Sequence, residues 1–397
     1  MSDIPMPDNP ILIAGAGIGG LTLALALSRI GRPTITIEQR TRVEEIGAGI
    51  QLSPNASRVL IGLGLGHALA KVAAEPRKLT IRSAKSGQTL STMPLGETMR
   101  SRYGAPYLTI HRADLQTILL DAVRGTDGAR LAFGRSVAGF AENRSHGIDI
   151  DCVSAATRET VSGQALVGAD GLWSTIAEQL GDQSKPEFRR HIAWRGLVAR
   201  QDWPKELPFD ETGLWLGPGA HLVHYPIRRG EMINLVAVTS DPENEPGWSR
   251  RGDADKIAKR MASWHPSAQK AIAAVGDWTI WSLYDRPPRK QWSHNRVTLL
   301  GDAAHPVLPF LAQGGALAIE DAAVLVNEMV HSPADPAAAF LRYETRRRPR
   351  AARVQAAARQ NGSLFHLSWP FSVARDFTMQ RTNISDRYDW LYGWSID

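Results

Sequence analysis

The stretch ILIAGAGIGGLTLALALSRIGRPTITIEQR, residues 11–40, decides the fold. Residues 11–14 are a short apolar run that predicts a strand buried on both faces, and the β-branched residues 34–37 predict a second strand. Between them, residues 21–30 are almost wholly apolar and predict a buried helix that Gly31 ends. Strand, helix and strand in this order predict a parallel pair within an α/β sheet.

Three glycines and one acidic residue indicate that this unit binds a ligand. Gly15, Gly17 and Gly20 form G-x-G-x-x-G after the first strand. They permit, in turn, a tight turn, close approach of the backbone to a pyrophosphate, and packing of helix on strand, while the helix start holds phosphate charge. Glu38 closes the second strand, where a carboxylate can bind an adenosine ribose. A glycine-rich turn that binds no ligand would explain the glycines but not Glu38. We therefore predict that the protein binds a dinucleotide, either NAD or FAD.

Composition limits the remaining possibilities. The 397 residues predict two domains or one large interleaved unit, and a net charge of +6 suits anionic ligands. The one dense basic cluster is interpreted as a solvated helix face rather than a nucleic-acid tract; it comprises Arg346, Arg347, Arg348 and Arg350. A single cysteine, Cys152, excludes an internal disulfide. Without an apolar run of about 18 residues or a signal peptide, we expect a cytoplasmic protein without a membrane span.

The segment VTLLGDAAHPVLPFLAQGGALAIEDA, residues 297–322, brings an acid and a histidine together. A strand over 297–300 delivers Asp302 to a sheet end, where α/β proteins bind ligands. A metal site lacks further ligands at suitable spacing, and a hydrolase lacks a G-x-S-x-G nucleophile, so we expect neither. We predict that His305 braces the loop through backbone hydrogen bonds. A helix over 316–330 follows a glycine pair, Gly314 and Gly315, which allows close backbone approach.

Four segments together resemble the class A flavoprotein aromatic hydroxylases, the single-component FAD monooxygenases, in the salicylate hydroxylase and 3-hydroxybenzoate 6-hydroxylase branch of the para-hydroxybenzoate hydroxylase-like family. The likeness runs from about residue 10 to about residue 365. Its segments are LVGADGLWS (166–174), the stretch 297–322 quoted above, TIHRADLQTIL (109–119) and EIGAGIQLSPNASRVLIGLGL (45–65).

The resemblance implies the fold and the cofactor. The expected architecture is α/β: a Rossmann-like FAD-binding domain, an interleaved substrate domain built on a mixed or antiparallel sheet, and C-terminal helices. The expected boundaries are 1–76, 106–180 and 293–365 for the FAD-binding domain, 77–105 and 181–292 for the substrate domain, and 366–397 for a C-terminal segment. Beyond the glycine turn and Glu38, the implied FAD contacts are Gln51, Arg112, Asp170, Asp302, Gly314 and Gly315.

One departure concerns the nicotinamide. Many relatives carry an arginine three positions after the serine of the 166–174 segment, whereas this chain has Ala177. That arginine helps to organise the nicotinamide and flavin region in the family. How NADH or NADPH docks is therefore left open.

The segment GAHLVHYPIRRG, residues 219–230, carries the candidate chemistry. His221 and Tyr225 alternate along a predicted strand and share one face, while His224 points to the other face and is interpreted as structural. The resemblance implies that His221 removes a phenolic proton and that Tyr225 orients the ring. Pro309 takes the place of the branch's substrate glutamine and is the third predicted substrate contact.

Together these residues predict an FAD-dependent monooxygenase. It would hydroxylate a small phenolic, hydroxybenzoate-like or hydroxynicotinate-like substrate with NAD(P)H and O2, through a flavin C4a-hydroperoxide, as a monomer or homodimer. Two alternatives stay open: a related FAD oxygenase acting on a larger substrate, such as an epoxidase or a tailoring hydroxylase of polycyclic phenols, and a non-catalytic flavin-binding redox protein.

Overall fold

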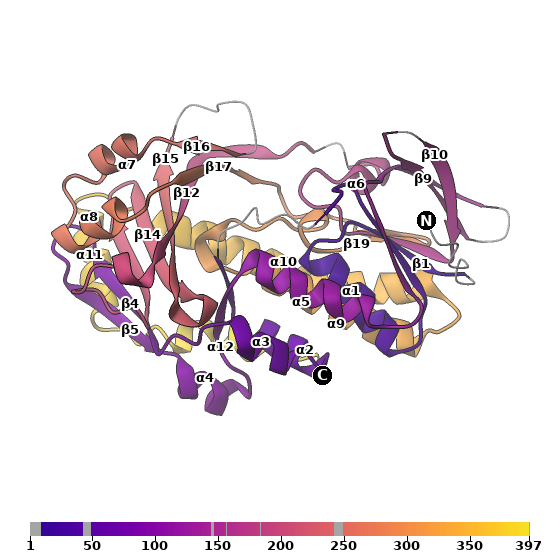
Figure 1. Cartoon of the computed structure of the whole chain (residues 1–397), viewed down its shortest axis with the longest axis horizontal. Coiled ribbons are helices and arrows are strands. Elements are labelled where there is room, and N and C mark those ends of the chain that lie inside the picture. The colour runs from indigo at the N-terminus through magenta and orange to yellow at the C-terminus, as the bar shows by residue number, and fades with distance from the viewer. Residues whose placement is uncertain are drawn as a thin grey trace.

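Two large β-sheets lie side by side in the molecule (Figure 1). The computed structural model describes residues 9–42, 49–143, 147–155, 157–182, 184–241 and 249–396. The glycine-rich stretch forms the centre of a six-stranded sheet, parallel except for one edge strand. Its strands, in spatial order, are β18 (Ser293–His294), β19 (Val297–Leu299), β11 (Ala165–Gly168), β1 (Ile11–Ala14), β2 (Thr34–Glu38) and β7 (Ala129–Phe133).

The second large sheet has eight strands and is mixed. Most neighbours are antiparallel, but β13 pairs with β4 in parallel. The spatial order is β16 (Ser249–Gly252), β17 (Trp278–Asp285), β12 (Glu187–Ala199), β15 (Met232–Ser240), β14 (Ala220–Ile227), β13 (Thr212–Gly217), β4 (Lys78–Ser83) and β5 (Thr89–Pro94). Two small sheets complete the strands: β10 (Arg158–Gly163), β9 (Ile148–Val153) and β8 (Ser136–Glu142), and the pair β3 (Gly49–Leu52) and β6 (Leu108–His111).

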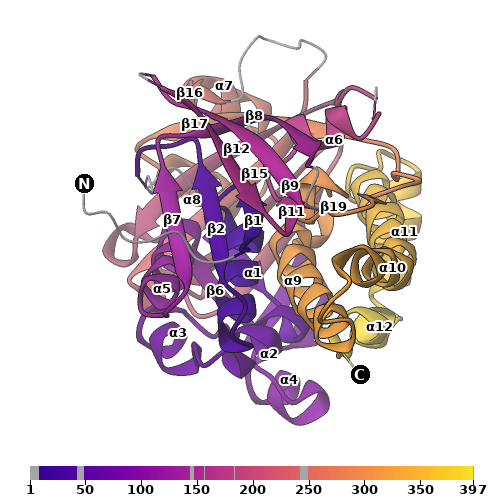
Figure 2. The ribbon, with the colours of Figure 1, turned by 90° about the vertical axis from the view of Figure 1, so that its right-hand side faces the viewer.

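Helices cover the six-stranded sheet, and further helices make up the C-terminal part of the chain. Helix α1 lies between α5 and α9 (Figure 2), and its buried apolar residues join the core beneath the parallel strands. The helices are α1 (Ile18–Arg29), α2 (Pro54–Gly62), α3 (Gly66–Val72), α4 (Gly96–Tyr103), α5 (Arg112–Arg124), α6 (Thr175–Gln179), α7 (Ala254–Arg260), α8 (Pro266–Ala273), α9 (Gly314–His331), α10 (Pro336–Phe365), α11 (Phe371–Met379) and α12 (Asp389–Tyr392).

This architecture confirms the predicted α/β fold with an interleaved mixed sheet and C-terminal helices. The first helix begins at Ile18 rather than at residue 21, because the last glycines of the turn are already helical. Similarly, the helix predicted over 316–330 includes its glycine pair and runs from Gly314 to His331. The domain boundaries themselves stay a prediction.

A buried cluster of charges joins α9 to α10. Arg347 forms ion pairs of 2.7 Å with both Glu320 and Asp321, and all three side chains are at most 1% exposed. Arg350, one turn further along α10, donates two more hydrogen bonds of 2.7 Å to Glu320. The interpretation of the basic cluster as a solvated helix face is therefore wrong for Arg347 and Arg350, whose spacing places both on the face that meets α9.

The same cluster holds the loop that precedes α9. Asp321 accepts hydrogen bonds from the Gly301 N–H at 3.0 Å and bonds the His305 ring at 2.5 Å. The N–H of His305 also donates to the Gly301 carbonyl. His305 thus braces the loop as expected, but its ring does so through a side-chain carboxylate rather than through backbone groups.

The charge balance at Asp321 links this network to pH. Burial alone would raise the pKa of Asp321, but His305 and Arg347 outweigh it and lower the pKa to about 2. A carboxyl whose folded pKa lies below its unfolded value of about 3.9 stabilises the fold above that value. Its contribution is lost as the pH falls from about 4 towards 2.

We predict that Arg347→Leu destabilises the protein strongly. Among the described residues, the substitution removes the only arginine paired with Asp321 and one of the two paired with Glu320, while both carboxylates stay buried. Removing one partner of a buried ion pair typically costs about 3–5 kcal/mol. Arg348→Leu on the same helix is the control: its partly exposed pair with Glu344 is of a kind worth about 0.3–0.5 kcal/mol. Urea denaturation followed by circular dichroism measures both. Equal losses for the two variants would contradict the central role of Arg347.

Candidate active site

The glycine turn combines close packing with one open position. Gly15 has a φ of +104°, and a Cβ there would lie 2.5 Å from the Ala169 carbonyl oxygen. A Cβ on Gly20 would lie 2.0 Å from the Gly15 carbonyl oxygen, so the helix can pack on the turn only with glycine. Beside Gly17, by contrast, no described atom other than those of Gly17 and its chain neighbours lies within 4 Å of the position that a Cβ would take. The backbone at Gly17 is therefore accessible to a ligand at the start of α1.

Glu38 ties this turn to the second strand. Its carboxylate accepts hydrogen bonds from the Ala16 N–H at 2.8 Å and from the Arg40 N–H at 2.9 Å. The acid therefore holds the glycine turn at the carboxyl end of β2. Its predicted contact with a ribose stays a prediction, and a carboxylate has lone pairs left for it.

Asp302 and Arg112 are both accessible to solvent and yet desolvated. Burial raises the pKa of Asp302, and the charges of His305 and Arg112 partly offset this. Burial lowers the pKa of Arg112, which Asp302 partly offsets. Because both side chains are in contact with solvent and are also surrounded by protein, we infer that they line a recess. The effect of each charge on the pKa of the other places Asp302, after β19, and Arg112, at the start of α5, near each other.

The start of α9 opens into the same recess. The position of a Cβ on Gly314 lies 3.9 Å from Asp302 Oδ1, and that on Gly315 lies near Ile18 and Ile50. No side chain at these two positions separates the helix start from a ligand. The structure thus brings together the glycine turn, Asp302 and the α9 terminus, as the sequence predicts.

Asp170 lies at the end of the neighbouring strand β11 and is engaged differently. It accepts hydrogen bonds from the Ser174 hydroxyl at 2.6 Å and the Ile176 N–H at 3.3 Å, so it secures the start of α6. Burial raises its pKa, and these hydrogen bonds oppose the rise. The predicted role of Asp170 in cofactor binding stays a prediction beside this structural one.

These features fit FAD. The unfilled space at Gly17 suits a pyrophosphate on a helix start, and accessible Asp302 suits a polyol hydroxyl. The 18-residue helix α9 supplies N–H groups and a positive dipole end for an anionic ring edge. Among the described residues, no group of three or more His, Cys, Asp or Glu side chains is placed to hold a metal ion. Nor does any described helix have the length and apolarity to cross a membrane.

The substrate-side residues share one face of β14. Tyr225 donates a hydrogen bond of 2.6 Å to the Gly49 carbonyl on β3. His221, four residues earlier, packs against Phe310 and Phe365, with ring centroids 5.5 and 5.4 Å apart. His224 points the other way, onto Trp203. The predicted alternation of the strand is confirmed.

His221 is held neutral. Burial, followed by the charges of His366 and His191, lowers its pKa well below 6.5. Its Nδ1 bonds His366 at 2.8 Å, and its Nε2 has no hydrogen-bond partner among the described residues. A neutral imidazole with a lone pair on a free nitrogen is a base available through the physiological pH range.

Gln51 and Pro309 approach this face from the cofactor side. Gln51, on β3, accepts a hydrogen bond of 2.5 Å from the Tyr107 hydroxyl and lies beside Tyr225. Pro309 begins the 3-10 turn Pro309–Leu311, whose middle residue is the Phe310 that packs on His221. The other described 3-10 turns are Arg200–Asp202, Arg228–Gly230, Gly301–Ala303 and Asp386–Tyr388.

Arg195 is a site residue that the sequence reasoning missed. Its guanidinium lies over Trp281, 4.9 Å from the ring centroid, and no described carboxylate pairs with it. Burial, and then repulsion from Arg112, lowers its pKa to about 10, while Tyr225 opposes this. A basic residue in the middle of the alternating segment HIAWRGLVAR was the available signal. His366, at the end of α10, was missed because its partners are distant in sequence.

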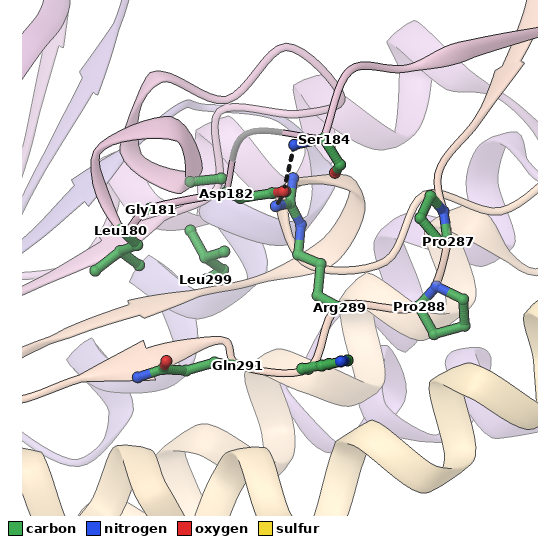
Figure 3. Close-up of a pocket in the computed structure, with 11 residues that line it drawn as sticks. Leu180, Gly181, Asp182, Ser184, Pro287, Pro288, Arg289, Gln291 and Leu299 are labelled. Carbon is green, nitrogen blue, oxygen red and sulfur yellow. Dashed lines mark hydrogen bonds and ion pairs between the residues drawn. The ribbon is translucent and has the colours of Figure 1, made fainter.

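A separate cavity of about 300 Å³ lies between the end of α6 and the segment 287–291 (Figure 3). Ala177, at the position where many relatives have arginine, is one of its lining residues. Arg289 also lines the cavity and pairs with Asp182 (Figure 3). Burial lowers the pKa of Arg289, which the charge of Asp170 partly offsets. The cavity does not include the residues that surround Asp302 or His221.

Comparison with known proteins identifies the family. Residues 8–358 match the model of a family described as FAD binding domain. The chain is 35% identical to a 3-hydroxybenzoate 6-hydroxylase of Polaromonas naphthalenivorans, over 100% of this chain and 98% of that protein. It is 37% identical to a 3-amino-4-hydroxybenzoate 2-monooxygenase of Streptomyces platensis, over 96% and 95%.

A solved structure extends this likeness to a bound cofactor. Klebsiella pneumoniae HpxO, complexed with FAD and uric acid, superposes with a TM-score of 0.84 and 26% identity, over 96% of both chains. The glycine turn, the Asp302 recess and the sheet that carries His221 are therefore parts of one known architecture. The chain belongs to the FAD-binding family, among its FAD-dependent aromatic hydroxylases.

Proposed function

We propose that the protein hydroxylates a small phenolic acid of the hydroxybenzoate or hydroxynicotinate kind, with NAD(P)H and O2 as co-substrates. The observation that carries this proposal is that one sheet holds both a neutral base, His221, and a cation without a described carboxylate partner, Arg195. A base can remove the proton of a phenol, and a cation can bind a carboxylate. The hydroxybenzoate names of the relatives support the same class.

The chain's own residues supply binding, orientation and proton transfer. FAD, when bound, takes electrons from the nicotinamide and activates dioxygen. The glycine turn, Glu38, Arg112 and Asp302 would hold the cofactor, and the start of α9 would favour negative charge on the ring. His221 accepts the phenolic proton at Nε2, which makes the aromatic ring electron-rich. Tyr225, fixed by its bond to Gly49, limits how the ring can tilt.

Arg195 would set the orientation of the substrate along the sheet. A carboxylate beside it relieves the repulsion from Arg112 and satisfies its buried Nε, which has no partner among the described residues. The phenolic hydroxyl then lies at the other end of the ring, towards His221. Discrimination follows, since a ligand without a carboxylate leaves a buried cation unpaired.

Asp302→Ala should weaken FAD retention. A hydrogen bond to a charged acceptor is worth about 1.5–3 kcal/mol, so we expect the FAD dissociation constant to rise roughly 10- to 100-fold. Titration of the apoprotein with FAD, followed by flavin fluorescence, measures this. Asp277→Ala, at a side chain 80% exposed, is the control. A fully loaded, yellow Asp302→Ala protein would overturn the assigned contact.

His221→Ala should slow hydroxylation by about 10²- to 10⁴-fold, the usual contribution of a placed general base, while the bound-flavin spectrum stays intact. Because its pKa lies well below 6.5, the wild-type rate should hold to a pH below that value before protonation removes the base. The assay is a screen of hydroxybenzoates, hydroxynicotinates and anthranilates for stimulated NAD(P)H oxidation and oxygen uptake, with products identified by mass. His294→Gln, on an exposed position of β18, is the control. Unchanged product formation in His221→Ala removes His221 from the mechanism.

Arg195→Gln should weaken binding selectively. The dissociation constant of a carboxylate-bearing phenol should rise roughly 10- to 100-fold, from the loss of one charge-assisted pair. A matched phenol without the carboxylate should bind at least as tightly as it does to the wild type, because the variant has no cation left unpaired. Perturbation of the flavin spectrum on ligand addition reports both constants. Arg200→Gln, at the exposed end of the same segment, is the control, and equal weakening of both ligands would refute the assignment.

A further inference from the structure

Three histidines form a hydrogen-bonded chain that ends at a backbone carbonyl. His221 Nδ1 lies 2.8 Å from His366 Nε2, and His366 Nδ1 lies 3.1 Å from His191 Nε2. His191 Nδ1 in turn lies 2.6 Å from the Arg189 carbonyl oxygen. The rings come from β14, the end of α10 and β12, so the chain crosses three elements far apart in sequence.

The carbonyl fixes the proton on every ring. A carbonyl only accepts hydrogen bonds, so the Nδ1 of His191 must donate, and its Nε2 in the neutral ring must accept. The Nδ1 of His366 is then the donor to His191, and its Nε2 accepts from His221. This leaves the Nδ1 of His221 protonated and its Nε2 as a lone pair. The nitrogen without a protein partner is therefore the basic one.

The packing keeps the three rings aligned. Phe310 contacts all of them, with ring centroids 5.5 Å from His221, 5.8 Å from His366 and 6.0 Å from His191. The His366 carbonyl accepts the Gly219 N–H at 3.1 Å, which ties the end of α10 to the turn before β14. An apolar cover of this kind strengthens the hydrogen bonds beneath it.

The surrounding charges favour neutral rings at rest. Burial, followed by His191, Arg375 and Arg260, lowers the pKa of His366 to about 4. Arg375, on α11, donates to the carbonyls of Leu364 and Phe365 just before this ring. A positive charge is thus costly on the two inner rings, His221 and His366. His191 is the ring at the far end of the chain and is half-buried.

We propose that His366 and His191 are positioning residues that set the tautomer of His221 and carry the substrate's proton away from it. The proposal rests on His221 being the base of the proposed function. His366 and His191 touch neither the substrate nor the flavin in this scheme. They act through the Nδ1 of His221.

The proton steps balance. The phenolic O–H breaks as an N–H forms at Nε2 of His221. The Nδ1 proton of His221 passes to Nε2 of His366, and the Nδ1 proton of His366 passes to Nε2 of His191. A phenolate is left in the site, and the positive charge lies on His191, which exchanges with water. When the product oxygen takes its proton back from Nε2 of His221, the same transfers run in reverse and restore the tautomers.

Two substitutions of His366 separate tautomer control from proton transfer. His366→Gln keeps an acceptor for His221 and a donor for His191, but an amide cannot pass a proton along the chain. His366→Phe removes both functions and keeps a ring. The first measurement is ¹⁵N NMR of the histidine rings in the FAD-loaded protein without substrate, which reports tautomers independently of activity.

We expect Nδ1-protonated His221 in the wild type and in His366→Gln, and a tautomer mixture in His366→Phe. In turnover with the substrate found by the screen above, kcat should fall roughly 10- to 100-fold in both variants, as for other partners that orient a reacting group. KM should stay within about twofold, because neither variant changes a substrate contact. The control is again His294→Gln, which should match the wild type in both measurements.

Each adverse outcome has its own meaning. A wild-type tautomer in His366→Phe overturns the role in tautomer control. Full kcat in His366→Gln overturns proton transfer and reduces His366 to a structural hydrogen-bond partner. If His221→Ala still loses hydroxylation while both His366 variants behave as wild type, the relay is wrong and the proposed function stands. If His221→Ala is fully active, His221 is not the base, and the relay that depends on it is refuted as well.

Discussion

The buried pairing of Glu320 and Asp321 with Arg347 and Arg350 is the constraint on which the site depends. Two carboxylates in adjacent positions cannot be buried without cations, since each uncompensated charge would cost several kcal/mol. The arginines satisfy them only while α10 lies against α9. The position of α10 therefore fixes the start of α9, and through His305 and Gly301 it fixes the loop that carries Asp302 and Phe310.

The same network reaches the cofactor side through neutral groups. Asn55, at the start of α2, donates to Glu320 at 2.6 Å and to Gln313 at 3.0 Å, and Gln313 donates to the Ser53 hydroxyl at 2.9 Å. Gln313 is the residue directly before the glycine pair of α9. The helix start that faces the flavin recess is thus held by side chains on two sides. A helix start held in this way has its N–H groups already oriented, which is the condition for electrostatic stabilisation by fixed dipoles.

How much of this could be predicted depends on whether the determining contacts are local. The glycine turn and the position of Glu38 at the end of β2 were predictable because they follow from spacing within one βαβ unit, and the alternation of His221 and Tyr225 follows from strand geometry. For Arg347 and Arg350 the sequence alone predicts a solvated helix face, because their partners lie on another helix. His366 bonds a ring 145 residues earlier and another 175 residues earlier. No periodicity in one sequence encodes such a pairing, so residues whose role depends on tertiary contact escaped the prediction.

The arginines of the site explain why an anionic substrate is the better proposal. Arg112 lowers the pKa of Arg195 less than burial does, and Asp302 opposes the lowering of the pKa of Arg112. Both arginines remain cations at neutral pH. Among the described residues no carboxylate pairs with Arg195, so the protein retains a desolvated positive charge whose described neighbours are the Trp281 ring and Tyr225. Retaining it costs stability, which is reasonable where a ligand carboxylate completes the pair. A neutral aromatic ligand would fill the same space and leave that charge uncompensated, so the unpaired guanidinium favours aromatic acids over neutral phenols.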